Sequence, residues 1–515
     1  MKPTTPAQIN RTEIDGVPVF WADTPGRLEA FLYFRVGVRD ESFATAGITH
    51  LIEHLAFSKL PAIKIDHNGQ VELGLTTFTA SGRPELVAAT LADICRSLSE
   101  LAAGGVELEM LANEVRVLEA EGSLAVPPSV AEALVSRYGL RGLGVAGAEP
   151  VFAERFTVEE VAAAAAKFFT RGNAALVLSG PPPEGLRLPL PSGGTVPRPA
   201  AREVPRAFPV EYESGGDSLV LSFAIPGEGA PLAGAATVLG KVLGDRVRSS
   251  LRRGRGLVYD LDIAYIALTA EQAVAVVTFD LKPANAVVVA REVIAVLGDL
   301  RRDGVTPDEL ADALTPIEEA GLDPQLPLWD ANDEAMLRIG AGGSPPHERL
   351  LAAMRSVTTR DVAHCLDGFE SSLMVGLPEQ SLSEDAGREG ILYPRPVHHP
   401  AALGKGEEYR RSILGAVALQ VPRDARLTIG GDGLSMLGDG EVQAYRWEDI
   451  AAVAWEPPAR NGSAPPACAV FGGDGFIMNL ASRWFRGGDR ALKSIADRVP
   501  ARIQYTDTVE TTEAS

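Results

Sequence analysis

Two histidines and a glutamate lie within five residues in the stretch from Gly47 to Phe57, GITHLIEHLAF. On an α-helix, residues four apart share one face, so His50 and His54 can point their imidazoles at a common metal ion with Glu53 beside them. The alternative is a helix that carries two histidines by chance. Because the chain has only 7 histidines in 515 residues, the pattern favours a metal site with its own general base.

A zinc ion in a catalytic site needs three protein ligands and leaves its fourth position to water. The order H-x-x-E-H is the inverzincin signature, which requires an acidic third ligand downstream. The segment NEVRVLEAEG offers Glu114 and Glu121, which are two helical turns apart and share a face, whereas Glu119 is turned away. Such a pair alone is typical of a solvated helix face. The upstream motif favours a role in the metal site.

These residues belong to a chain too long for one hydrophobic core, and its length predicts about three domains. The composition, 46% hydrophobic and 23% charged, is that of a folded protein. A net charge of -20 without a basic block argues against nucleic acid as a partner. The 3 cysteines form no C-x-x-C pair, which argues against a disulfide framework. Without an apolar leader or a membrane-length apolar stretch, we expect a cytoplasmic protein with no membrane span.

Two segments rich in proline and glycine divide the chain. We expect an N-terminal metal-binding domain at 1–180, a linker at 181–209, and a second domain without the motif at 210–382. A second linker follows at 383–409, a C-terminal module at 410–503 and a disordered tail at 504–515.

The elements expected in the first two domains follow the same order. Two strand-like runs precede the motif, and a strand (TTFTAS), three helical segments and a strand (AALVLSG) follow it. Thr157 is expected to cap the last of these helices, with Glu160 three residues later. The second block repeats strands and long helices without the histidines. The order therefore predicts an α+β fold with two related domains in tandem.

The motif, the Glu114 and Glu121 helix, the segment GNAALVLSGP and the linker together resemble the pitrilysin/insulinase family of zinc metallopeptidases, which includes the mitochondrial processing peptidases. The resemblance covers most of residues 15–380. It implies that His50, His54 and Glu121 bind one Zn²⁺ per chain. It also implies that Glu53 is the general base and that Glu114 supports the site from behind the ligands.

Within the second domain, LRRGRGLVYDL resembles the segment with which the family contacts its substrate. On this resemblance Arg252 and Tyr259 would contact the peptide and the reacting carbonyl; without it, a surface charge and a half-buried aromatic would be the better interpretation. The stretch between His54 and Glu121 is shorter than in most relatives. In it, IDHNGQVELGLTTF departs from the family's edge-strand pattern, and His67 is expected in a loop.

The C-terminal module changes to short strands and turns, in which Asp432-Gly433 and Asp474-Gly475 are hairpin signals. It resembles a pleckstrin-homology-like domain, a small β-barrel closed by a C-terminal helix. If the module only recruits or assembles, its deletion should leave peptide hydrolysis largely intact.

The resemblance implies a zinc-dependent endopeptidase that cleaves peptides or unfolded segments inside a closed chamber. Family members are clamshells of four related domains, and this chain has two, so a homodimer or a heterodimer with a related subunit is expected. The alternative is a catalytically reduced member that acts as a partner or binding subunit. A third hypothesis makes the chain an inert scaffold for the C-terminal module.

Overall fold

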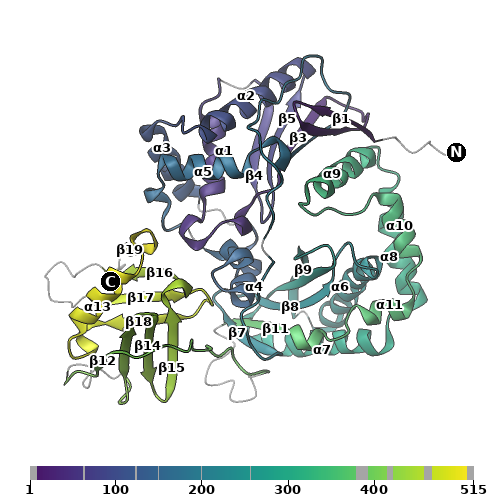
Figure 1. Ribbon diagram of the computed structural model, residues 1–515. Coiled ribbons are helices and arrows are strands. Elements are labelled where there is room, and N and C mark those ends of the chain that lie inside the picture. The colour runs from purple at the N-terminus through teal and green to yellow at the C-terminus, as the bar shows by residue number, and fades with distance from the viewer. Residues whose placement is uncertain are drawn as a thin grey trace, which may run out of the picture.

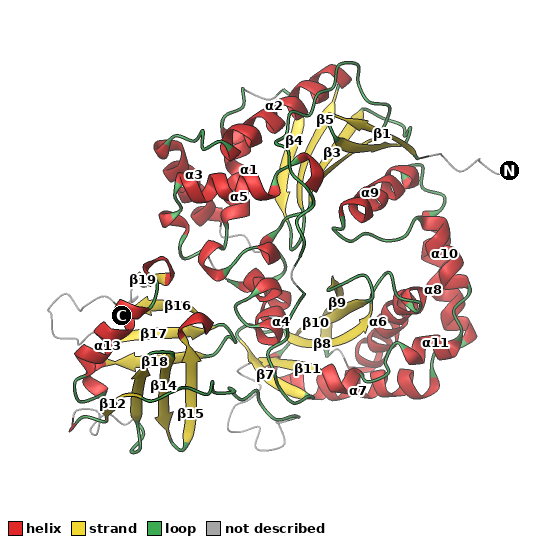
Figure 2. Cartoon of the chain, in the orientation of Figure 1, coloured by secondary structure: helices red, strands yellow, loops and turns green. Residues whose placement is uncertain are grey.

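The computed structural model describes residues 9–61, 64–121, 125–148, 150–198, 200–255, 257–378, 392–413, 421–456 and 467–506. Figure 1 shows two α+β domains, one above the other, and a C-terminal module beside them. Their helices and strands are distinguished in Figure 2. The fold is therefore a tandem α+β arrangement, as the sequence predicts.

The first domain is built on a six-stranded sheet in the order β1-β2-β6-β3-β5-β4. Its strands are β1 (Asn10–Ile14), β2 (Val17–Trp21), β3 (Leu28–Phe34), β4 (Asp66–Val71), β5 (Thr76–Gly82) and β6 (Ala174–Leu178). Its helices are α1 (Ile48–Ser58), α2 (Pro84–Ala102), α3 (Leu108–Glu121), α4 (Pro128–Tyr138) and α5 (Val158–Phe168). The expected cap of α5 is confirmed, because the Thr157 hydroxyl accepts from the Glu160 amide at 3.2 Å.

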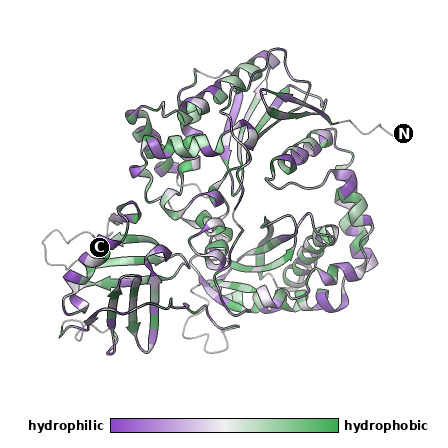
Figure 3. Ribbon diagram, in the orientation of Figure 1, coloured by the Kyte–Doolittle hydropathy of each residue, from purple (hydrophilic) through white to green (hydrophobic). Residues whose placement is uncertain are grey.

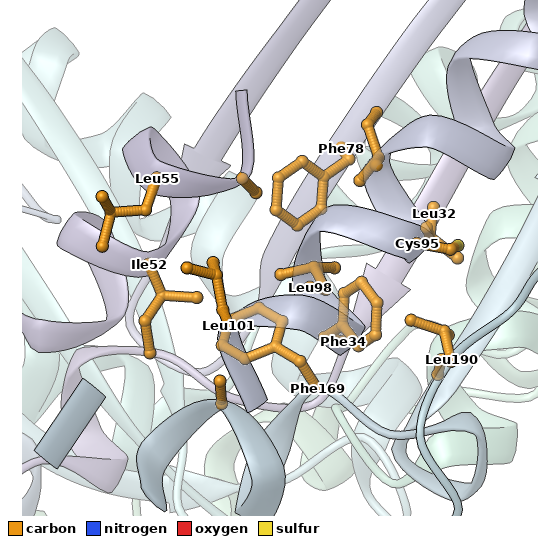
Figure 4. Close-up of a cluster of buried hydrophobic side chains, with 14 of the residues drawn as sticks. Leu32, Phe34, Ile52, Leu55, Phe78, Cys95, Leu98, Leu101, Phe169 and Leu190 are labelled. Atoms are coloured by element: carbon orange, nitrogen blue, oxygen red, sulfur yellow. The ribbon is translucent and has the colours of Figure 1, made fainter. Parts of the chain in front are cut away.

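Helices α1, α2, α3 and α5 share one apolar core with the sheet. Leu51, Ile52 and Leu55 place the buried face of α1 in this core, where Phe34 and Phe78 come from the strands (Figure 4). Burial of that face fixes the rotation of α1 about its axis. His50 and His54 therefore face away from the core.

The second domain has a five-stranded sheet in the order β7-β11-β8-β10-β9. Its strands are β7 (Val210–Ser214), β8 (Leu219–Pro226), β9 (Val258–Ala267), β10 (Gln272–Leu281) and β11 (Met374–Pro378). Its helices are α6 (Ala233–Arg255), α7 (Ala286–Asp303), α8 (Pro307–Ala320), α9 (Leu326–Ile339), α10 (His347–Arg355) and α11 (Thr359–His364). Strands β8, β10 and β11 of this sheet are mostly hydrophobic (Figure 3).

The pairing pattern supports the predicted duplication. In each domain one pair is parallel, β2 with β6 and β7 with β11, and the next three pairs are antiparallel. By position, α6 corresponds to α1 and the edge strand β9 corresponds to the edge strand β4.

The two domains exchange helices. Helix α9 packs Leu328, Ala331 and Ala335 on the face of the first sheet opposite to α1. The α4 residues Val130 and Leu134 pack in turn on the second sheet. Two polar contacts also hold α9 on the first domain. The Tyr33 hydroxyl donates a hydrogen bond of 2.8 Å to Asn332, and Arg11 forms an ion pair of 2.5 Å with Glu334.

The C-terminal module consists of two four-stranded sheets and a helix, and its described strands do not close into the barrel expected. Its elements are β12 (Gly406–Arg410), β13 (Arg426–Gly430), β14 (Gly433–Gly438), β15 (Glu441–Arg446), β16 (Ile450–Trp455), β17 (Ala467–Gly472), β18 (Ile477–Ala481), α13 (Gly488–Arg498) and β19 (Gln504–Thr506). Both predicted hairpins are present, β13 with β14 and β17 with β18.

The predicted tail begins too early, because β19 pairs with β16 inside the module. The rest of the tail, 507–515, lies outside the described residues, as does the first part of the second linker, 383–391. In the first linker, Leu186, Leu188 and Leu190 are buried in the core of the first domain, so this segment packs on that domain. Among the described helices, none is long and apolar enough to cross a bilayer.

Candidate metal centre

The start of helix α1 is fixed by a carboxylate from outside the helix. Gly47, the residue before α1, has φ 89°, and Glu41 accepts hydrogen bonds from the amides of Gly47 at 2.8 Å and Thr49 at 2.9 Å. These amides are among the donors that a helix N-terminus leaves without an internal partner. Glu41 therefore holds the first turn of the helix that carries the motif.

Replacing Glu41 with alanine should lower the free energy of unfolding by about 2 kcal/mol, because amides at the start of α1 lose their acceptor. Thermal or urea unfolding would measure the loss. Glu109→Ala, in the first turn of α3, removes an exposed acidic side chain and is the matched control. Equal stability of the two variants would contradict this role for Glu41.

The side chains of His50, His54 and Glu121 converge. The two Nε2 atoms lie 3.2 Å apart, and Glu121 Oε2 lies 3.6 Å from Nε2 of His50 and 3.4 Å from Nε2 of His54. Two ligands of a tetrahedral zinc ion with bonds of about 2.0–2.1 Å are about 3.3–3.4 Å apart. The three atoms therefore form a triangle of the size that a zinc ion needs, and imidazole and carboxylate are ligands that zinc accepts.

Glu53 is buried at the side of this triangle, and its Oε2 lies 3.8 Å from Nε2 of each histidine. Burial is the main cause that raises the pKa of Glu53 to about 7. His54 opposes this rise, whereas the carboxylates of Glu121 and Glu114 add to it. A carboxyl group with a pKa near neutrality can both accept and return a proton.

Glu114 lies behind His54, with 3.4 Å between its Oε2 and Nδ1 of His54. A carboxylate in this position holds the ring orientation and leaves Nε2 turned toward the triangle. Burial and then the neighbouring His54 lower the pKa of His50, which favours the neutral imidazole that a metal binds. Glu121 is different, because it is the last residue of α3 and 47% of its side chain is exposed.

Strand β4 runs past Glu53. At Gly69 an added Cβ would lie 1.8 Å from Glu53 Oε1, so only glycine leaves room for the carboxylate there. His67, expected in a loop, is an exposed residue of β4, and its ring centroid lies 5.4 Å from that of Phe57. Among the described strands β4 pairs only with β5, so its outer edge is open beside the triangle. The edge strand is thus present despite the departure seen in the sequence.

Arg252 and Tyr259 lie in the other domain. Arg252 is in helix α6, and its side chain lies outside the described residues. Tyr259 is on β9 and 60% exposed. Figure 1 shows α6 and β9 well separated from α1 and α3. The structure therefore does not bring Tyr259 to the histidines of its own chain.

Comparisons with known proteins agree with the architecture. The family model described as "Peptidase M16 inactive domain" matches residues 155–316. Similar solved structures include a protease from Helicobacter pylori, with 15% identity and a TM-score of 0.56, covering 72% of this chain and 99% of that one. A peptidase M16 inactive domain from Pseudomonas fluorescens has 15% identity and a TM-score of 0.54, with 76% and 100% covered. The chain has a pitrilysin-type fold.

Another structure with this pitrilysin-type fold is a chain of complex III2 from Candida albicans, determined with Inz-5 bound. It has 14% identity and a TM-score of 0.59, with 74% of this chain and 99% of that one covered. Folds of this type thus occur in multi-subunit complexes. No curated protein matches the sequence.

The segment that the family model matches, residues 155–316, begins after Glu121. It includes Tyr259 but not the two histidines or Glu53, so the word "inactive" in its description concerns a segment without the motif. Sequence reasoning missed Glu41 and Gly69. An acidic residue shortly before a helix start and a glycine inside a strand are the signals that would have indicated them.

Proposed function

We propose that the protein is a zinc-dependent endopeptidase that hydrolyses peptides or unfolded segments. The observation that carries this proposal is the triangle of His50, His54 and Glu121, with edges of 3.2, 3.4 and 3.6 Å and the buried carboxyl group of Glu53 beside it. In this proposal the three side chains hold the ion. When bound, zinc supplies a Lewis acid that acidifies water and polarises a carbonyl.

Glu53 is the proton carrier. Its carboxylate takes a proton from the attacking water and returns it to the amine that leaves. Glu114 keeps the His54 ring in place. The open edge of β4 would pair with the backbone of an extended peptide, because unpaired N–H and C=O groups there can form one more ladder. This would lay the scissile bond beside Glu53.

The assembly we propose is a dimer. Tyr259 and helix α6, which carries Arg252, lie in the second domain, away from the triangle of the same chain. The second domain of another subunit could bring both side chains to the site, where they would contact the reacting carbonyl. Either a second copy or a related subunit could fill this role.

A second candidate function is that of a catalytically reduced partner subunit. The description of the matched family model and the likeness to a chain of complex III2 favour it. Metal analysis and cleavage of a peptide library by the full chain, alone and in cell extract, separate the two. We expect about one zinc ion per chain and peptide cleavage. Zinc without cleavage in either setting would favour the partner subunit, and absence of zinc would reject the peptidase.

Gly69 offers a test at the edge strand. Gly69→Ala should displace the Glu53 carboxylate, which is the movable end of a flexible side chain, and lower kcat about 10²-fold or more while zinc stays bound. Gly194→Ala is the control, because nothing lies within 4 Å of an added Cβ there. Unchanged kcat in Gly69→Ala would contradict the proposed contact between strand and base.

For the C-terminal module we propose a pleckstrin-homology-like order of elements, with two four-stranded sheets in place of a closed barrel. This proposal is supported by the order of the elements along the chain. The four strands β12 to β15 are followed by the three strands β16 to β18 and then by helix α13.

A further inference from the structure

A cavity lies where four parts of the chain meet, and we call it the junction cavity. Its volume is about 840 Å³. The wall comes from the first domain near Arg39 and Tyr138, from the first linker at 200–205, from the second linker at 398–401, and from the C-terminal module at Ala444 and Tyr445. It is separate from the metal centre, because it contains neither histidine of the motif.

The hydroxyl group of Tyr138 is the first sign that this cavity takes a ligand. Tyr138 is 2% exposed, and its hydroxyl has no hydrogen-bond partner among the described residues. Burial of a hydroxyl without a partner costs free energy, and native structures avoid it. Arg39 acts electrostatically on this hydroxyl, so the two groups lie near each other.

The carboxylates around the cavity already have partners. Asp40 lies 3.4 Å from Arg198, Glu203 lies 2.5 Å from Arg137, Asp449 lies 2.9 Å from Arg141 and Asp474 lies 2.7 Å from His398, while Glu41 accepts from the backbone before and within α1. Asp40 also acts electrostatically on Arg39, but its ion pair is with Arg198.

Three cations in the wall have no such partner. In the described parts of the chain, no carboxylate forms an ion pair with Arg39, Lys167 or Arg202. Arg39 donates to the carbonyl of Ala267 at 2.8 Å, and the Lys167 ammonium lies 4.4 Å from the ring centroid of Phe168. Burial, and then the charge of Arg198, lower the pKa of Arg39 to about 10. An anion in the cavity would relieve this cost.

We propose that the junction cavity binds a small organic anion, a molecule with a carboxylate or phosphate group on an apolar body. Arginine forms paired hydrogen bonds with either group, and the Tyr138 hydroxyl would donate another. The volume is in the range of small-molecule sites, about 300–1,000 Å³. Leu143, Val196 and Ala201 supply apolar wall for the body of the ligand. This proposal does not depend on peptidase activity.

Titration calorimetry of the full chain tests the proposal with phenyl phosphate, benzoate, inorganic phosphate and neutral benzamide. We expect phenyl phosphate or benzoate to bind with a Kd below about 1 mM, and the pair shows which anionic group is preferred. Inorganic phosphate should bind more weakly than phenyl phosphate, and benzamide should not bind. Binding of benzamide as tight as that of benzoate, or no binding of either aromatic anion, would overturn the proposal.

Two variants locate the binding. Tyr138→Phe removes a hydroxyl that has no partner to lose, so its Tm should equal or exceed that of the wild type, while the anion binds about 10-fold more weakly. Arg39→Gln should weaken binding by about the same factor. Arg302→Gln on α7 removes an exposed arginine elsewhere and should bind as the wild type does. Wild-type affinity in both cavity variants would show that the anion binds elsewhere.

Discussion

Glu53→Gln should abolish peptide hydrolysis while the chain keeps its zinc. Glutamine has nearly the shape of glutamate but cannot accept the proton of the attacking water, so kcat should fall by roughly 10²- to 10⁴-fold. The ligand atoms of the two histidines and Glu121 are untouched by the change. Metal content and single-turnover cleavage of a fluorogenic peptide, measured on the same preparation, would test this.

His50→Ala is the companion variant. It removes one of the three atoms of the triangle, so it should lose both metal and activity, whereas Glu53→Gln should lose activity alone. Substantial turnover in the glutamine variant would exclude Glu53 as the base. Loss of zinc from that variant would instead indicate that Glu53 is itself a ligand, which its distance of 3.8 Å from each histidine nitrogen argues against.

Deletion of residues 410–515 should lower both Tm and activity, contrary to the expectation that the module only recruits or assembles. Phe43 and Phe152 of the first domain form an apolar cluster with Ala452, Phe471 and Tyr505 of the module. Its ring centroids lie 6.2 Å apart for Phe43 and Phe471 and 5.2 Å apart for Phe152 and Tyr505. Deletion would expose this cluster just before the helix that carries the motif.

The matched control for this deletion is a chain that ends after Thr506, which keeps β19 and the apolar cluster. It should unfold and cleave peptides as the full chain does. Differential scanning fluorimetry and peptide hydrolysis compare the two. If the chain without 410–515 has the Tm and kcat of the control, the contact has no role in holding the first domain.

The sequence predicts a helix or strand well when the signals for it lie within the same segment of the chain. It predicts poorly which distant segment that element packs against. Strand β5 was predicted to within one residue, as TTFTAS, and the capping box of α5 with its two residues, because periodicity and caps are local signals. The segment that forms α8 to α11 was not predicted. For α9, its apolar stripe indicates a helix but does not reveal that the sheet of the other domain receives it.

In the metal centre, too, the contacts set by local sequence could be predicted and those set by the tertiary fold could not. Helical spacing brings His50, Glu53 and His54 together, whereas the assignment of Glu121 rested on a resemblance. Local signals in the sequence could have marked Glu41 and Gly69 as candidates, but not their contacts, which depend on how a loop and an edge strand approach α1 in space. The separation of Tyr259 from the triangle is likewise a property of the whole chain.

The exchange of α4 and α9 restricts how the protein can open. Each helix is anchored in the sheet of the other domain, so a hinge between the two domains would have to pull both apolar faces into water. We therefore expect the two domains of one chain to move as a rigid body. In the proposed dimer, admission of the proposed peptide substrate would then require the subunits to separate from each other, and the rate of entry would depend on the strength of the contact between chains.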